Sequence, residues 1–377
     1  MNIMDRYILK QFLQVFLICF CSLTGLFVVL DAVSHLDTFI AYAEGRGSLL
    51  AVMGRYYAYQ SIGFFDRTAA ILALVSAVFT ITWLRRYNEL TALLAAGVRQ
   101  RRIVMPLIIT SVVIAAMTAT SRELVLPVIR DELSRKPTEL SGETTRALSP
   151  RYDYETDVGL AGASISISEQ RIDKPAFLLP KTLQAHGRQL NAEEAYYRPP
   201  QGERPGGYLL CKVSQPPNLA EKPSLSLGKR RVLITPHDAD WLDEDQCFVA
   251  SNVAFDQLEN TDAWRRFAST RELMTGLRNP SLDYGADVRV AIHSRIVQPL
   301  LDVTLMFLGL PLILSRGGRN VFLASGLCFA VVVTFYLVTL GSQMLGSQLW
   351  FSPAFAAWLP LMIFIPTAVV MAEPLRE

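Results

Sequence analysis

Few residues of this chain are of the types that perform chemistry, and those few are dispersed. The four histidines are scattered, and no two stand four residues apart, as two metal ligands on one helical face would. The sequence contains no HExxH, CxxC, GxSxG or GxxxxGK[ST] motif. We therefore predict no catalytic residue, no metal site, no cofactor bound by this chain and no ATP site of its own.

Two acidic features remain after this exclusion. Residues 237–240 read His-Asp-Ala-Asp, which can attract a cation, although acidic turns of this kind are usually only solvated. Asp302 lies inside an apolar run, where an acid is costly and usually faces a cavity or a partner. A polar interface position and a functional position both fit Asp302.

Residues 89–97, Glu-Leu-Thr-Ala-Leu-Leu-Ala-Ala-Gly, are better suited to binding than to catalysis. Leu90, Leu93 and Leu94 have the i, i+3, i+4 spacing of a short helix with one apolar face, and Gly97 is a natural C-terminal stop. One interpretation is an interfacial helix whose following arginines lie on anionic lipid. The other is a coupling helix that fits a groove on a soluble ATPase, with Glu89 as the polar residue that makes the contact specific.

The elements around this segment are apolar and long. The chain has 377 residues, of which 51% are hydrophobic and 19% charged. A bilayer core of about 30 Å requires about 20 apolar residues in a helix. The first of the apolar runs is longer than a signal peptide requires, so we expect it to be retained. Six runs predict transmembrane helices: residues 12–30, 68–84, 103–120, 296–314, 321–341 and 353–372.

Basic residues in the short connections predict the orientation of these helices. Cytoplasmic loops are enriched in Lys and Arg. The basic residues fall on one side of a six-helix arrangement, so both termini are predicted to be cytoplasmic and residues 122–292 to lie outside. These residues are Arg6, Lys10, Arg85, Arg86, Arg99, Arg101, Arg102, Arg316 and Arg319.

The outer segment has the pattern of a β domain. Short apolar or alternating stretches at residues 163–168, 208–213, 231–235 and 247–255 are separated by turn-forming clusters, which favours a sandwich or jelly roll. Ser269 and Glu272 have the spacing of a capping box and predict a helix. Cys211 and Cys247 lie in the same segment, and both a disulfide and two free thiols fit them.

The predicted fold is therefore an α-helical membrane protein with six transmembrane helices and an inserted periplasmic all-β, jelly-roll-like domain. Residues 1–121 hold helices one to three and the coupling helix near residues 85–97. Residues 122–292 form the β domain, which ends in a short helix, and residues 293–377 hold helices four to six. No basic cluster alternates with aromatic residues, so we expect no binding of nucleic acid.

Several motifs, taken in their order along the chain, resemble those of a known family. The first helix starts with an RY…F motif, and the segment after helix two reads E-x-x-A-L-x-A-x-G and is followed by Arg and Pro. Helix three exits through a Glu that is followed by a Pro four residues later. Helix four starts with an H-x-R…P motif and ends in a Pro-Leu pair. The matching residues are Arg6, Tyr7, Phe12, Glu89, Ala92, Leu93, Ala95, Gly97, Arg102, Pro106, Glu123, Pro127, His293, Arg295, Pro299, Pro311 and Leu312.

On these residues the chain resembles the YjgP/YjgQ permeases, the two membrane subunits (LptF and LptG) of the lipopolysaccharide-export ABC transporter. It departs from the family pattern at Arg99, Arg122 and Ala291, and its first helix has no lysine near its outer end. These departures leave open which of the two subunits it resembles more and how the lipid headgroup is contacted.

The resemblance implies a non-catalytic permease subunit of the bacterial inner membrane that extracts lipopolysaccharide from the outer leaflet and passes it to a periplasmic bridge protein. It implies a paralogous or identical permease partner and a cytoplasmic ATPase dimer, which hydrolyses ATP and docks on the coupling helix. The residues assigned to this ATPase contact are Glu89, Ala92, Leu93, Ala96, Gly97 and Arg102.

Two alternatives of other classes remain open at this stage. One is a permease of a different lipid or lipoprotein ABC transporter, although that family usually has four helices rather than six. The other is a membrane-anchored sensor or assembly scaffold whose outer domain binds a ligand, and such a protein needs no coupling helix.

Overall fold

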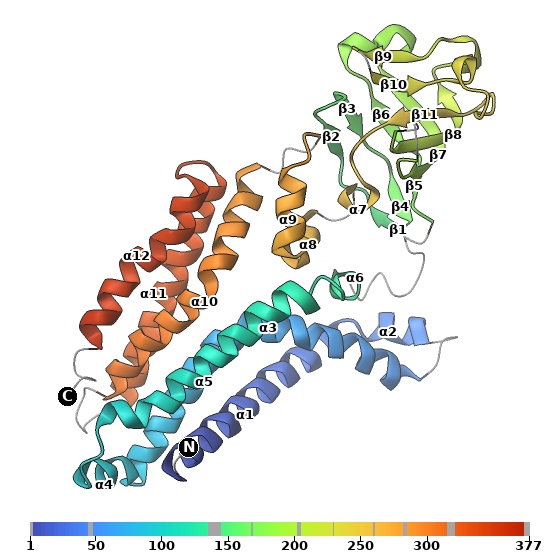
Figure 1. Ribbon diagram of the computed structural model, residues 1–377. Helices are drawn as coiled ribbons and strands as arrows, with labels where there is room; N and C mark the ends of the chain where they lie inside the picture. The colour runs from blue at the N-terminus through green and yellow to red at the C-terminus, as the bar shows by residue number, and fades with distance from the viewer. Residues whose placement is uncertain are drawn as a thin grey trace. The chain divides into compact units, whose positions relative to one another are not determined.

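The computed structural model describes residues 3–43, 48–134, 145–166, 169–201, 205–228, 230–258, 261–281, 285–314 and 321–372 (Figure 1). The chain forms two compact units. The helical unit comprises Met1–Leu36, Leu50–Leu133 and Gly285–Glu377, and the β unit comprises Asp37–Leu49 and Ser134–Tyr284. Arg316 and Arg319, two of the arginines used to predict orientation, lie outside the described residues.

Six helices in the described residues are long and apolar enough to cross a membrane, which confirms the prediction of six. The helical elements are α1 (Ile3–Ser34), α3 (Leu49–Arg86), α4 (Glu89–Ala95), α5 (Gln100–Thr120), the π-helical turn η1 (Ser121–Val125), α6 (Arg130–Ser134), α10 (Gly285–Leu314), α11 (Val321–Ser347) and α12 (Pro353–Met371). α3 and α10 begin well before the apolar runs at residues 68 and 296, because the helical hydrogen bonds continue through polar turns that hydropathy does not detect. For the same reason the helical unit extends to Leu133 and resumes at Gly285, inside the predicted outer segment of residues 122–292.

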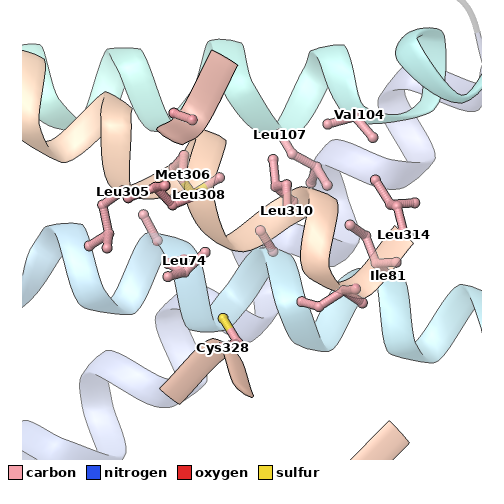
Figure 2. Close-up of a cluster of buried hydrophobic side chains, with 14 of the residues drawn as sticks. Leu74, Ile81, Val104, Leu107, Leu305, Met306, Leu308, Leu310, Leu314 and Cys328 are labelled. Atoms are coloured by element: carbon pink, nitrogen blue, oxygen red, sulfur yellow. The ribbon is translucent and has the colours of Figure 1, made fainter. Parts of the chain in front are cut away.

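The core of the helical unit lies where α3, α5 and α10 meet (Figure 2). Leu74 and Ile81 of α3, Leu107 of α5, and Leu305 and Leu310 of α10 are at most 1% exposed. α10 is the most extensively buried of the six spanning helices and packs against α5, α11 and α12. It is therefore the central helix of this unit.

The glycines of the spanning helices divide into two kinds. A Cβ at Gly309 would collide with the side chain of Leu74, and one at Gly346 would collide with the Cβ of Ala356. A Cβ at Gly326 or Gly341 would meet no atom of the described residues within 4 Å. Close helix contact is therefore found at Gly309 and Gly346, where the missing side chain lets two helices approach each other.

The β unit contains one continuous, wholly antiparallel sheet, which confirms the inserted β domain. Its main strand order is β1-β4-β5-β7-β8-β11-β10-β9, and β6 and β3 branch from β7, with β2 beyond them. The strands are β1 (Thr145–Ala147), β2 (Arg151–Asp153), β3 (Val158–Leu160), β4 (Ser164–Ser166), β5 (Arg171–Asp173), β6 (Ala176–Leu178), β7 (Gln189–Arg198), β8 (Gly207–Gln215), β9 (Leu225–Leu227), β10 (Arg230–Ile234) and β11 (Cys247–Ala250). Helices α2 (Leu36–Ala43), α7 (Phe255–Leu258), α8 (Thr261–Phe267) and α9 (Thr270–Leu277) and the 3₁₀ turns η3 (Lys181–His186), η4 (Leu219–Glu221) and η5 (Pro236–Asp238) complete the order.

Each of the four predicted strands coincides at least partly with an observed one. β8 and β10 match closely, and β4 falls within residues 163–168, of which 167 and 168 lie outside the described residues. The prediction for residues 247–255 is wrong after Ala250, since Phe255 begins α7. The longest strand, β7, was missed because its Ala-Glu-Glu-Ala centre has the composition of a helix.

The predicted capping box of α9 is confirmed. Ser269 accepts a hydrogen bond on Oγ from the backbone N–H of Glu272 at 3.2 Å, and Glu272 accepts one from the N–H of Ser269 at 2.8 Å. Cys211 and Cys247 are free thiols. Cys247 of β11 pairs with Leu210 of β8. Because side chains alternate along a strand, the next residue of β8, Cys211, points to the other face of the sheet. A disulfide between Cys211 and Cys247 therefore cannot form.

Candidate functional site

α4 forms a short turn of helix between two spanning helices, and left-handed residues delimit it. α3 ends at Arg86, and Asn88 adopts φ 56°, a conformation that Asn tolerates better than most residues. At the other end Gly97 has φ 79°. The N–H of Gly97 donates to the carbonyl of Leu94, and that of Val98 donates to the carbonyl of Leu93. This pair of bonds is a Schellman motif, so the predicted stop at Gly97 rests on a specific backbone geometry.

The two faces of α4 differ in their surroundings. Leu90 is 4% exposed and belongs to the core of the helical unit, and Leu93 and Val98 pack against that core from partly buried positions. The opposite surface presents small side chains that are exposed, together with Leu94, which is 37% exposed. The exposed small residues are Ala92, Ala95, Ala96 and Gly97. α4 is therefore anchored by its leucines and offers a shallow, small-residue face.

Glu89 links α4 to the first helix. The Tyr7 hydroxyl of α1 donates to Glu89 Oε1 at 3.2 Å. Both residues belong to the motifs noted in the sequence, but nothing in a single sequence pairs residues so far apart. The Glu89 carboxylate, predicted to make the contact with a partner specific, thus also joins α4 to α1.

A second link joins the same end of the unit to α10. Arg85 Nη2, near the end of α3, donates to the carbonyl of Leu314 at 2.7 Å, and Leu314 is the last residue of α10. The start of α1, the end of α3, α4, the start of α5 and the end of α10 therefore share one end of the helical unit (Figure 1).

The arginines after α4 face outward. Arg99, Arg101 and Arg102 are all exposed, and α5, which starts at Gln100, has no acid in its first turn. The helix dipole disfavours cations at this position, so these arginines do not serve the stability of α5. Their exposure suits an anionic partner outside the chain.

The intramembrane polar residues form an internal network. Arg122 of η1 binds Asp66 of α3, with Nη2 to Oδ1 at 3.0 Å, and both side chains are at most 20% exposed. Asp302 of α10 accepts a hydrogen bond from Gln298 Nε2 at 2.8 Å and lies within electrostatic range of that ion pair. The void beside Asp302 has a volume of about 10 Å³, enough for about one water molecule. This favours a polar interface position for Asp302 over a substrate site.

The other polar features of the sequence also have structural partners. Asp31 accepts a hydrogen bond from the Tyr57 hydroxyl at 2.9 Å. Asp238 is bonded by the backbone N–H of Ser224 and by His237, and these bonds lower the pKa of its carboxyl. Among the described residues, no three His, Cys, Asp or Glu side chains come together as a metal site would require.

The family comparison agrees with this architecture. Residues 6–151 and 249–373 match the model of the lipopolysaccharide export system permease LptF/LptG. The chain belongs to the LptF/LptG permease family. The match covers the spanning helices and α4 but omits most of the sheet, and no curated protein sequence matches the chain significantly.

Family membership makes this chain a lipopolysaccharide export permease at the level of the family. Of the residues predicted for the ATPase contact, the structure brings Ala92, Ala96 and Gly97 onto one exposed surface, with Arg102 exposed just beyond it. Leu93 and Glu89 are instead engaged partly within the helical unit. Sequence reasoning missed Tyr7 as the partner of Glu89 and Asp66 as the partner of Arg122. The pair of Asp66 and Arg122 had one signal in the sequence, because Arg122 departs from the family pattern.

Proposed function

We propose that this chain is one of two permease subunits of an ATP-driven exporter in the bacterial inner membrane. It takes lipopolysaccharide from the outer leaflet and passes it to a periplasmic bridge protein. The family supports lipopolysaccharide export, and the ATPase, the second subunit and the bridge are the proposed parts.

The observation that carries this proposal is the division of α4 into an anchored and an exposed face. A coupling helix must present a surface to its partner and also transmit force to the spanning helices. The alanine face of α4 is open, whereas Leu90 is buried in the bundle core. Small side chains allow a groove on a partner to approach the helix backbone closely.

The contacts of α4 define the route by which motion would spread. Glu89 connects α4 to α1 through Tyr7, and Arg85 connects the end of α3 to the end of α10. Closure of an ATPase dimer against α4 would therefore move several spanning helices together. In the proposed cycle this motion collapses a cavity between two permease subunits and expels the lipid toward the β domain.

The surface of the spanning helices suits such a cavity. Among the described residues of α1 only Ile8, Phe12 and Thr24 are buried, and the most apolar stretch of α11 is only 22% buried. Apolar walls accept acyl chains, and a path covered by protein avoids a cost of about 0.8 kcal/mol for each CH₂ exposed to water. The β domain, whose sheet has an apolar inner face, would receive the chains.

The alternative is a sensor or assembly scaffold. It would use the β unit to bind a ligand, and it would have no need of the exposed alanine face. A substitution in the exposed alanine face of α4 therefore distinguishes the exporter subunit from the sensor or scaffold.

The test is purification of the tagged chain in mild detergent, with mass spectrometry of the proteins and lipids that accompany it. The informative variant is Ala92→Arg, because Ala92 is exposed and Arg maintains helix propensity. Glu89→Arg serves as a second variant that also breaks the bond to Tyr7. The matched control is Gln348→Arg, an exposed position just beyond α11, far from α4 in sequence.

We expect an ATPase, a paralogous membrane subunit and lipopolysaccharide with the unmodified chain and the control. Ala92→Arg should lose the ATPase and retain the membrane subunit. If the chain purifies alone, or with an unrelated protein that Ala92→Arg does not disturb, the proposal fails and the scaffold function takes its place.

A further inference from the structure

A groove of about 560 Å³ lies between α5, α10 and α12 in the helical unit. Its size falls within the range of about 300 to 1,000 Å³ that is typical of small-molecule sites. Apolar side chains from all three helices line it, including Met105, Phe307, Ile365 and Val369. Val369 is 54% exposed, so the described residues leave the groove open.

Among the described residues that line the groove, one is charged, and it lies at an end of the groove. Thr304 also lines the wall. Its hydroxyl donates to the carbonyl of Leu300 at 2.7 Å and is therefore not free to donate to a ligand in the groove. Arg101, in the first turn of α5, contributes an exposed guanidinium that has no partner among the described residues. The site is thus an apolar trough between spanning helices that ends at a cation.

We propose that this groove binds an anionic glycerophospholipid, with an acyl chain in the trough and the phosphate at Arg101. Inside a bilayer the apolar wall alone selects nothing, since the surrounding lipid tails are equally apolar. Selectivity must come from the arginine, and basic pockets between transmembrane helices bind anionic headgroups. The charge complementarity therefore favours an anionic lipid over a zwitterionic one.

This site is separate from the transported lipid of the proposed function. Arg101 lies four residues after Gly97, so the groove opens at the end of the unit that carries α4. In the proposed orientation that end meets the inner leaflet, whereas lipopolysaccharide is taken from the outer leaflet. A lipid bound here would brace the start of α5 beside α4.

The test is native mass spectrometry of the full chain, taken from bilayers with equal amounts of phosphatidylglycerol and phosphatidylethanolamine of the same acyl chains. One arginine near the membrane surface predicts a preference of about fivefold for the anionic lipid. Arg101→Gln should abolish this preference. Arg99→Gln is the matched control, since Arg99 is also exposed but does not line the groove.

A photoreactive p-benzoylphenylalanine in place of Val369 identifies what occupies the trough. Cross-linking to phospholipid supports the proposal. Cross-linking to a second polypeptide or to lipopolysaccharide would overturn it. Equal binding of the two lipids by the unmodified chain, or a preference that survives in Arg101→Gln, would overturn it as well, and neither result bears on the ATPase contact of α4.

Discussion

In the helical unit large apolar side chains such as Leu17 and Ile18 are about 60% exposed, whereas in the β unit Phe177, Tyr208 and Phe248 are fully buried. A water-soluble surface rarely carries so many exposed apolar residues along one element. The two units are therefore built for different surroundings. The helices expose their apolar sides to lipid or to another membrane protein, and the sheet hides its apolar side from water.

The units also differ in how they satisfy buried polar groups. In the spanning helices Ser76, Thr80 and Thr339 donate to carbonyls four residues earlier in the same helix. In the β unit Asp153 is bonded to Ser251, 98 residues away. These hydroxyls of the spanning helices are thus satisfied within one helix, whereas Asp153 is also bonded across the fold of the β unit. Removing one such group should consequently do more damage in the β unit.

The largest effect is expected for Asp153→Ala. Asp153 is fully buried and accepts bonds from the backbone N–H groups of Glu155 and Thr156 and from Ser251 Oγ. Its loss should cost the β unit about 3 to 5 kcal/mol, because three donors lose their buried acceptor. Hydrogen exchange should rise in β2, β8 and β11 while the spanning helices stay protected.

Asp240→Ala is the control for this variant, since Asp240 is exposed, and it should change stability by less than about 0.5 kcal/mol. Equal protection of the sheet in both variants would show that Asp153 does not hold the β unit together.

Asp66→Ala tests an ion pair that joins two helices of the helical unit. The change leaves Arg122 without its carboxylate at a largely buried position. We expect a loss of about 2 to 3 kcal/mol, measured as thermal unfolding in detergent. The double variant Asp66→Ala/Arg122→Leu should recover part of this loss, and a double variant that is no better than the single one would argue against the ion pair.

Two glycines of α11 test packing within the helical unit with the same substitution. Gly346→Ala forces a Cβ against Ala356 of α12 and should cost about 1 to 2 kcal/mol. A Cβ at Gly341 would meet nothing among the described residues, so Gly341→Ala should be neutral or stabilise the helix by up to about 1 kcal/mol. If thermal unfolding of the chain alone ranks them in the opposite order, the α11–α12 contact is wrong. A loss at Gly341 seen only in the assembled transporter would place that glycine at a subunit contact.

The smallest effect is a pH dependence of the β unit at Glu155. Burial alone would raise the pKa of this carboxyl, but the hydrogen bonds from Arg230, Ser281 and Asn252 outweigh burial and lower it. A lowered pKa in the folded state stabilises the fold above the ordinary value of 4.5, and this stabilisation is lost as the pH falls below it. The difference in Tm between the unmodified chain and Glu155→Gln should therefore shrink below pH 4.5. If the difference in Tm between the two proteins does not change with pH, the bonds to the Glu155 carboxylate are not its source.

The spanning helices and α4 were predictable because their signals lie within a few residues of each other. Apolar runs revealed six helices, and Glu89, the leucine spacing and Gly97 predicted the extent of α4. The family resemblance rested on equally local motifs and is confirmed. The sheet was less accessible, because β7 is identified by its pairing with β5, β6 and β8 rather than by its own composition.

The membrane class, the inserted β domain, the family and the position of α4 could all be predicted from the amino-acid sequence. Hydropathy, capping and turn residues act over one or two helical turns, so they can be recognised in a linear pattern. The folded structure was needed to show which face of α4 is exposed, that Tyr7 bonds to Glu89, that Asp66 pairs with Arg122, and that Arg101 lies at the end of an apolar groove. These features join residues far apart in the chain, and their partners are set by how whole elements pack.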